Sequence, residues 1–229
     1  MIKLNGISRS FGRVTALTEV SFEIPEGSIT GIIGPNGAGK STIFNIITGY
    51  LKQDSGDFFL LGERNPPFEK RMKLISYMPE NLKIYPELRT SEFVHFMSKT
   101  TGRSPDRFVE VLNLKHVWNR RIKNLSKGYA QRVKLFFALL PPKNILLLDE
   151  PFDGFDPIQL VEITDLLREE NARGRTFVLS IHHLSHAEKI CNYFVLLKEG
   201  KVIETGNLNE LKNRYDASNL EEIFIRALS

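Results

Sequence analysis

A glycine-rich segment at residues 34–42 has the residue types and the spacing of a phosphate-binding loop. Four residues separate Gly34 from Gly39, and Lys40 and Ser41 follow at once. Such glycines let backbone amides converge on a phosphate chain, while the lysine neutralises the β and γ phosphates and the serine ligates Mg²⁺. We therefore expect a nucleotide phosphate site lined by Gly34, Pro35, Asn36, Gly37, Ala38, Gly39, Lys40, Ser41 and Thr42.

A second chemical feature is a pair of acids at the end of an apolar run. Residues 145–148 are Ile-Leu-Leu-Leu, and Asp149 and Glu150 follow them. Alone, such a run is equally well a strand followed by a solvated loop, but a phosphate loop needs a carboxylate on a neighbouring strand to hold its metal through water. Successive side chains of an extended segment point to opposite sides, so Asp149 can serve Mg²⁺ while Glu150 faces an attacking water. Glu150 is therefore the candidate general base.

The elements around these residues predict an α/β fold. Residues 17–24 and 28–33 are β-like runs with a turn between them, and helical spacing follows the glycine-rich segment. From residue 144 onward, strands are expected at 145–148 and 176–181 and helices at 157–171 and 184–190. Continuous apolar strands bracketed by helices imply a parallel sheet that is covered on both faces.

Between these two parts lies a block that is mostly helical. Short strands are expected at 57–61 and 74–77, followed by helices at 91–99, 105–114 and 126–140, the last ended by two prolines. We interpret residues 81–140 as a helical subdomain inserted into a single domain of residues 1–229. Near the end of the chain we expect a hairpin from 193–197 and 201–204 and a helix at 220–228.

Composition excludes several other classes of protein. The 229 residues are 41% hydrophobic with one cysteine, so a disordered chain and a disulfide framework are ruled out. The formal net charge of +4 is evenly spread and too small to indicate a nucleic-acid surface. Because neither an export signal nor an apolar run of about 20 residues is present, we expect a cytoplasmic chain that does not itself cross a membrane. Cys191 is expected to be a buried thiol.

Three further segments, with the phosphate loop and the acidic strand, resemble the ATP-binding subunits of ABC transporters over essentially the whole chain. Residues 125–132 resemble the family's signature segment, with Lys127 and Tyr129 where glycine and glutamine are usual. Residues 153–157 resemble its short aspartate loop, and residues 179–183 resemble the segment with its switch histidine. These segments follow one another along the chain in the family's order.

The resemblance implies a fold, an activity and a set of site residues. The implied fold is α/β, with a P-loop NTPase core containing a parallel sheet, an N-terminal antiparallel β part and the inserted helical subdomain. The implied activity is ATP hydrolysis, with ATP and Mg²⁺ as cofactors. The implied catalytic residues are Glu150, His182 and Lys40, the implied metal-site residues are Ser41, Glu80 and Asp149, the last through water, and Phe11 is the residue expected to stack on adenine.

The resemblance also implies a head-to-tail dimer of this chain with itself or with a paralogue. Each ATP would lie between the phosphate loop of one chain and the signature segment of the other, where Ser126 and Gly128 would bind the γ-phosphate in trans. A helix that begins at Ser126 would present free amides to such an anion. The alternatives are that Ser126 is an ordinary helix cap, that Phe11 is a core residue and that Glu80 is a surface acid.

The implied function is to power substrate translocation, as export, through a separate membrane-spanning permease subunit. Glu80, residues 81–89 and the Ser-Lys-Gly of the signature segment are most similar to the ABC-2 export-type branch. The chain would then lie on the inner face of the cell membrane, and we expect residues 80–96, where Ile84, Tyr85 and Leu88 flank a proline, to contact the permease. The alternatives are a non-transport ABC-class ATPase in DNA repair or translation, and a regulatory subunit that binds ATP without hydrolysing it. No nucleic-acid partner is expected.

A cluster of three histidines suggests a different chemistry, metal binding. His182, His183 and His186 are close in the sequence, but no set of cysteines or carboxylates accompanies them at ligand spacing. We assign His182 to the switch position of the family, and we expect His183 and His186 to belong to a helix start and to a solvated face.

Overall fold

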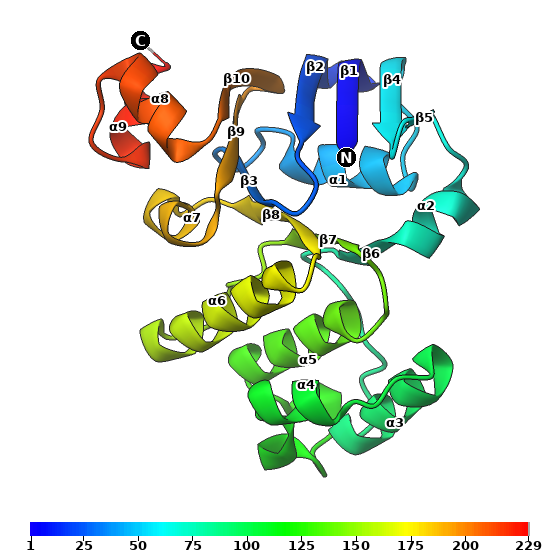
Figure 1. The fold of residues 1–229 in the computed structure, drawn as a ribbon. Helices are drawn as coiled ribbons and strands as arrows, with labels where there is room; N and C mark the ends of the chain where they lie inside the picture. The colour runs from blue at the N-terminus through cyan, green and yellow to red at the C-terminus, as the bar shows by residue number, and fades with distance from the viewer. Residues whose placement is uncertain (229) are drawn as a thin grey trace.

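The computed structural model describes residues 1–228. They form three layers, namely an antiparallel sheet, a central sheet that is mostly parallel, and a layer of helices (Figure 1). The central sheet has six strands in the order β10-β9-β3-β8-β7-β6, and β10 alone pairs antiparallel to its neighbour. Its strands are β3 (Ile29–Ile33), β6 (Ile75–Met78), β7 (Ile145–Asp149), β8 (Thr176–Ile181), β9 (Tyr193–Lys198) and β10 (Lys201–Gly206). The predicted parallel sheet and the predicted hairpin, β9 with β10, are thereby confirmed.

Alternate residues of the central strands pack into two different cores. Leu146 and Leu148 of β7 belong to the core between the sheet and the helices beneath it, whereas Leu147 belongs to the core on the opposite face. β3, β7 and β8 are buried along their whole length. Because successive strand residues point to opposite faces, only an uninterrupted apolar run satisfies both cores.

The upper layer is an antiparallel sheet, whose strands take the order β2-β1-β4-β5. Its strands are β1 (Ile2–Phe11), β2 (Val14–Ile24), β4 (Ser55–Leu60) and β5 (Glu63–Arg64). The predicted runs 17–24 and 28–33 therefore belong to different sheets and do not form a hairpin. The physical reason is burial, since β2 alternates between buried and exposed residues toward its end and suits a one-sided sheet, whereas β3 is buried on both faces.

Helices form the lower layer and flank the sheet (Figure 1). The helical block between β6 and β7 contains α3 (Thr90–Thr101), α4 (Asp106–Val111), two 3₁₀ turns (Leu114–Val117 and Ile122–Asn124) and α5 (Lys127–Leu139). α6 (Pro157–Ala172), α7 (Leu184–Ile190) and α9 (Leu220–Arg226) lie where helices were expected. Phe93 and Phe136 of the block share one core with Phe177 of the sheet, so the separation of residues 81–140 as a subdomain stays a prediction.

Several elements were not predicted, namely β1, the short β5, α2 (Phe68–Leu74), α8 (Leu208–Tyr215) and the two 3₁₀ turns. α8 is short and mostly polar, with Leu211 buried and with Leu208 and Tyr215 packed half-buried against the core. Its start nevertheless carries a recognisable signal, because Asn207 and Glu210 form a capping box. α1 (Lys40–Thr48) confirms the helix expected after the glycine-rich segment. Over residues 1–228, the helices are too short or too polar to span a membrane.

Cys191 lies where the sequence predicted, in a buried position against the sheet. Burial raises the pKa of its thiol, and its Sγ lies 3.0 Å from where a Cβ on Gly31 would stand. The thiol therefore behaves as a small apolar group.

We expect Leu147→Ala to lower the free energy of unfolding by about 2 to 5 kcal/mol, because it leaves a cavity in the centre of the sheet. Val161→Ala, at an exposed position of α6, is the control and should change it by less than about 0.5 kcal/mol. Urea denaturation followed by circular dichroism measures both. Equal stability of the two variants would contradict the two-core packing of β7.

Candidate active site

The register of the central strands brings the predicted site residues to one edge of the sheet. β3 pairs with β8 so that Ile33 lies opposite Ile181, and β7 pairs with β8 so that Asp149 lies opposite Ser180. The residues that follow these strand ends are therefore neighbours in space. They include the phosphate loop, Glu150 and His182.

A cavity of about 530 Å³ opens at this edge. It is lined by Ala16, Asn36, Gly37, Ala38, Gly39, Lys40, Ser41, Thr42, Glu80, Asp149, Glu150, Asp153 and His182. The structure thus brings together most of the residues predicted from the sequence. Gly34 and Pro35 contact the cavity indirectly, through Lys40, whereas Phe11, Ser126 and Gly128 are not part of its lining.

Two glycines of the phosphate loop occupy positions that no larger residue fits. Gly39 has a φ of 103°, and a Cβ there would lie 2.6 Å from the Leu17 side chain and 2.9 Å from the Ala16 carbonyl oxygen. A Cβ on Gly34 would lie 2.4 Å from the Leu197 carbonyl oxygen. α1 begins directly after Gly39, so the amides of its first turn point into the cavity region, as an anion site requires.

Lys40 is a buried cation at the base of the cavity. Its Nζ donates to the carbonyl oxygens of Gly34 at 2.8 Å and Pro35 at 3.2 Å, and it lies 3.8 Å from Glu150 Oε1. Its side chain is only 7% exposed. A buried ammonium group needs such partners, and an incoming phosphate would offer it stronger ones.

Ser180 was not predicted, yet it positions both acids. Its hydroxyl donates to Asp149 Oδ1 and accepts a hydrogen bond of 2.9 Å from the Glu150 amide. Asp149 is 2% exposed, so this bond satisfies a carboxylate that is almost fully removed from water. A polar residue in the otherwise apolar β8, two positions before His182, was the available signal.

Glu150 is held between several groups in a strained backbone conformation. Its φ is 47°, in the left-handed region, and its carbonyl oxygen accepts a 3.0 Å hydrogen bond from Gln131 Nε2. Its Oε2 lies 2.6 Å from His182 Nδ1. Burial raises the pKa of the Glu150 carboxyl above its ordinary value, while His182 and Lys40 oppose that shift. This half-buried carboxylate is suited to accept a proton.

The remaining predicted residues lie around the cavity. Glu80 lines it, and its carbonyl oxygen accepts a 2.8 Å hydrogen bond from Lys134 of α5. Phe11 is 48% exposed with the Arg9 guanidinium 5.0 Å from its ring centroid, so the alternative that it is a core residue is wrong. Its stacking on adenine stays a prediction.

The signature segment lies at the start of α5, against the aspartate loop. The Ser126 hydroxyl caps α5 by accepting from the Tyr129 amide at 3.4 Å. Lys127 Nζ lies 2.7 Å from Asp153 Oδ1, and a Cβ on Gly128 would approach the Gly154 carbonyl oxygen at 3.1 Å. The Tyr129 ring stacks on His116 at 5.6 Å. Lys127 and Tyr129 thus contact residues of their own chain.

The three histidines contact one another in series. The ring centroids of His182 and His183 are 4.1 Å apart, and those of His183 and His186 are 5.5 Å apart. His183 is the residue before α7, as expected of a helix start. In the described part of the chain, no three histidine, cysteine or carboxylate side chains are arranged to hold a metal ion.

The fold and the cavity define a phosphate-loop ATPase. Residues 17–153 match the family described as ABC transporter, and the chain belongs to that family. It is therefore an ATP-binding subunit of the ABC class, which hydrolyses ATP.

Relatives and solved structures agree over the whole chain. The lantibiotic transport ATP-binding protein SrtF of Streptococcus pyogenes is 32% identical, with 98% of this chain and 96% of that protein aligned. An uncharacterised ABC transporter ATP-binding protein of Methanocaldococcus jannaschii, MJ1023, is 30% identical over 92% of this chain and 79% of its own. A solved ATP-binding subunit of an ABC transporter has a TM-score of 0.89 at 27% identity, with both chains covered completely. The dimeric cassette MJ0796 has a TM-score of 0.81 at 26% identity, covering 91% of this chain and 99% of that one. The predicted fold class is confirmed.

The raised pKa of Glu150 predicts the pH dependence of ATP hydrolysis. A general base acts in its deprotonated form, so the rate should fall as the pH is lowered through that pKa, above the value of about 4.3 of an ordinary glutamate. In His182→Ala the residual rate should fall at a still higher pH, because a group that lowers the Glu150 pKa is lost. Steady-state ATPase assays across pH measure both profiles. If the fall in rate at low pH disappears in His182→Ala, the titrating group is instead the His182 imidazole.

Proposed function

We propose that this chain hydrolyses ATP to power export through a separate membrane-spanning subunit of the ABC-2 type. The observation that carries the proposal is a physical link between the cavity and a second groove. Lys134 lines that groove and donates to the carbonyl oxygen of Glu80, which lines the cavity. A change at the phosphates can thereby reach a surface that a partner would contact.

The residues of the cavity fit ATP and Mg²⁺. A volume of about 530 Å³ lies within the usual range for ligand pockets, ~300 to 1,000 Å³. The phosphate-loop amides and Lys40 would hold the phosphates, and the Ser41 hydroxyl and Asp149 carboxylate are the oxygen donors that Mg²⁺ prefers. When bound, Mg²⁺ would neutralise phosphate charge. Asp149 would hold the ion through a water molecule, and the Glu80 carboxylate would be a further oxygen donor at the site.

In the proposed mechanism, Glu150 accepts the proton of the attacking water. Lys40 stays against the phosphates and offsets the charge that develops on them. His182, which contacts Glu150 in this structure, would bind the γ-phosphate once it is present and so sense its loss. No covalent intermediate with the protein is needed.

We further propose that two copies of the chain, or one copy and a paralogue, enclose each ATP head to tail. Ser126 is exposed at the start of α5 and is absent from the lining of the cavity of its own chain. It is therefore free, with Gly128, to contact the nucleotide of a partner. The dimeric state of the solved cassette MJ0796 supports this arrangement.

The proposed permease surface is the groove lined by Leu82, Lys83, Ile84, Pro86, Ile122, Lys123, Ala130 and Lys134, about 290 Å³ in volume. Tyr85 beside it is 69% exposed, and Phe96 of α3 is 53% exposed. Ile84 and Leu88 are half-buried against the core, and Phe93 is buried within it. The permease would place the chain on the inner face of the membrane.

A DNA-repair or translation role has less support, because the net charge is low and transport is named in the relative SrtF.

Glu150→Gln should bind ATP with Mg²⁺ but lose hydrolysis, because the amide keeps the shape and lacks the basicity. An ATP-dependent dimer should accumulate in size-exclusion chromatography with light scattering. Lys40→Ala is the control and should bind no ATP while staying folded. A Glu150→Gln variant that stays monomeric at saturating ATP and still turns over would contradict both the base and the dimer.

Tyr85→Ala combined with Lys83→Glu should weaken assembly with the permease, because both side chains are exposed at the groove. ATP affinity and the melting temperature should stay close to the parent values. Leu61→Ala, an exposed leucine of the upper layer, is the control. Co-purification in detergent at matched expression measures assembly, and a parental yield of the double variant would place the permease contact elsewhere.

A further inference from the structure

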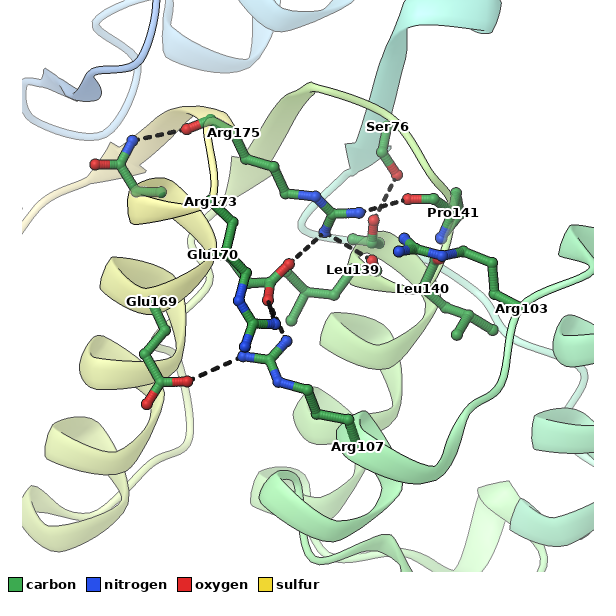
Figure 2. A network of polar contacts seen from close by, with 12 residues as sticks. Ser76, Arg103, Arg107, Leu139, Leu140, Pro141, Glu169, Glu170, Arg173 and Arg175 are labelled. Carbon is green, nitrogen blue, oxygen red and sulfur yellow. Dashed lines mark hydrogen bonds and ion pairs between the residues drawn. The ribbon is translucent and has the colours of Figure 1, made fainter.

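A buried carboxylate far from the cavity is surrounded by arginines from several parts of the chain. Glu170, near the end of α6, is 4% exposed. Its Oε1 accepts from Arg107 of α4 and, at 3.1 Å, from Arg173, while its Oε2 lies 3.1 Å from Arg175 Nη1 (Figure 2). Arg107 also reaches Glu169 at 2.9 Å. We call these residues the Glu170 cluster.

The charges of this cluster depend on one another. The carboxyl end of a helix carries a negative partial charge, so an acid in the last turn of α6 is unfavourable unless cations surround it. Conversely, the three guanidinium groups would repel one another without the carboxylate between them. Because Glu170 and Arg175 are both nearly inaccessible to water, neither charge is screened by solvent. Removing Glu170 therefore disturbs every partner at once.

The same cluster fixes the end of α5. A helix leaves its last carbonyl groups without partners within the helix, and the last turn of α5 has no basic residue of its own. Arg175 donates to the Leu139 and Pro141 carbonyl oxygens, both at 2.8 Å (Figure 2). Arg103 donates to the Leu140 carbonyl oxygen at 3.4 Å. The Ser76 hydroxyl of β6 donates to the Ala138 carbonyl oxygen at 2.8 Å.

The opposite ends of α5 and α6 carry the signature segment and the aspartate loop. α5 has 13 residues and α6 has 16, so they span about 20 and 24 Å as stiff rods. At its amino end α5 contacts the loop that precedes α6 through the Lys127–Asp153 pair, and Arg132 Nη2 of α5 lies 3.0 Å from Glu162 of α6. The relative position of α5 and α6 is thus set near their amino ends and at their carboxyl ends.

We propose that Glu170 is a positioning residue for the ATP sandwich. By holding Arg107 and Arg175 it fixes the amino end of α4 to the carboxyl ends of α5 and α6, which sets where Ser126 and Gly128 meet the nucleotide of the partner chain. This inference rests on the proposed head-to-tail dimer. The contacts of the Glu170 cluster given above all lie outside the lining of the cavity, so we expect binding of ATP by a single chain not to depend on the cluster.

The test separates binding of ATP from closure of the dimer, in a Glu150→Gln background that prevents turnover. Glu170→Gln keeps the shape of the side chain and removes its charge. We expect the ATP-dependent dimer to weaken by roughly tenfold in analytical ultracentrifugation, while a fluorescent ATP analogue binds the monomer as in the parent. Glu169→Gln is the matched control, because the Glu169 side chain is exposed and pairs with Arg107. It should leave both quantities nearly unchanged.

A second variant keeps the inference testable if Glu170→Gln does not fold. Arg107 is half-exposed, and Arg107→Ala leaves Arg173 and Arg175 on the carboxylate. It should weaken the dimer by a smaller factor without changing ATP affinity, and Arg107→Lys should restore part of the loss. A purely structural role would instead lower the melting temperature and leave dimer affinity equal among folded variants.

The outcomes distinguish this inference from the proposed function. If the Glu150→Gln parent dimerises with ATP and Glu170→Gln dimerises equally well, the positioning role alone is overturned. A parent that stays monomeric overturns the head-to-tail dimer and the positioning role with it. Loss of ATP affinity in the Glu170→Gln monomer would also overturn the inference, because the effect would then reach the cavity directly.

Discussion

The in-register pairing of β3, β7 and β8 is the constraint on which the rest of the structure depends. Each strand is buried on both faces, so a shift of one residue in register would move every side chain of the strand from one core to the other. Because the three strands end at one edge, the phosphate loop, Glu150 and His182 must meet there. The active site is thus a consequence of packing between two apolar cores.

The polar groups at that edge satisfy one another. Ser180 bonds both acids, Lys40 lies on the loop carbonyls, and His182 contacts Glu150. These bonds offset the cost of burying charge, and phosphate groups would replace several of them with charge-assisted ones. The long helices α5 and α6 extend from this edge region to the Glu170 cluster, and the proposed positioning role would act through them.

The local chemistry could be predicted from the sequence, whereas contacts between distant residues could not. The phosphate loop, Asp149 and Glu150 were recognisable because their meaning lies in short spacings beside a strand. The placement of β2 and β3 in separate sheets depends on which faces are buried, which a turn between two runs does not reveal. Glu170 meets Arg107 across 63 positions of the sequence, and no local pattern indicates that contact. The half-burial of Ile84 and Leu88 depends on how their loop packs back onto the core, which no local pattern indicates.

Amide hydrogen exchange with and without a non-hydrolysable ATP analogue and Mg²⁺ tests the central claim most directly. The account predicts that the analogue slows exchange at residues 36–42 and at residues 149, 150 and 182, where backbone amides adjoin the cavity, and leaves α8 and α9 unchanged. Binding of the analogue with no protection at residues 36–42 would contradict it, because the nucleotide would then occupy a different part of the molecule.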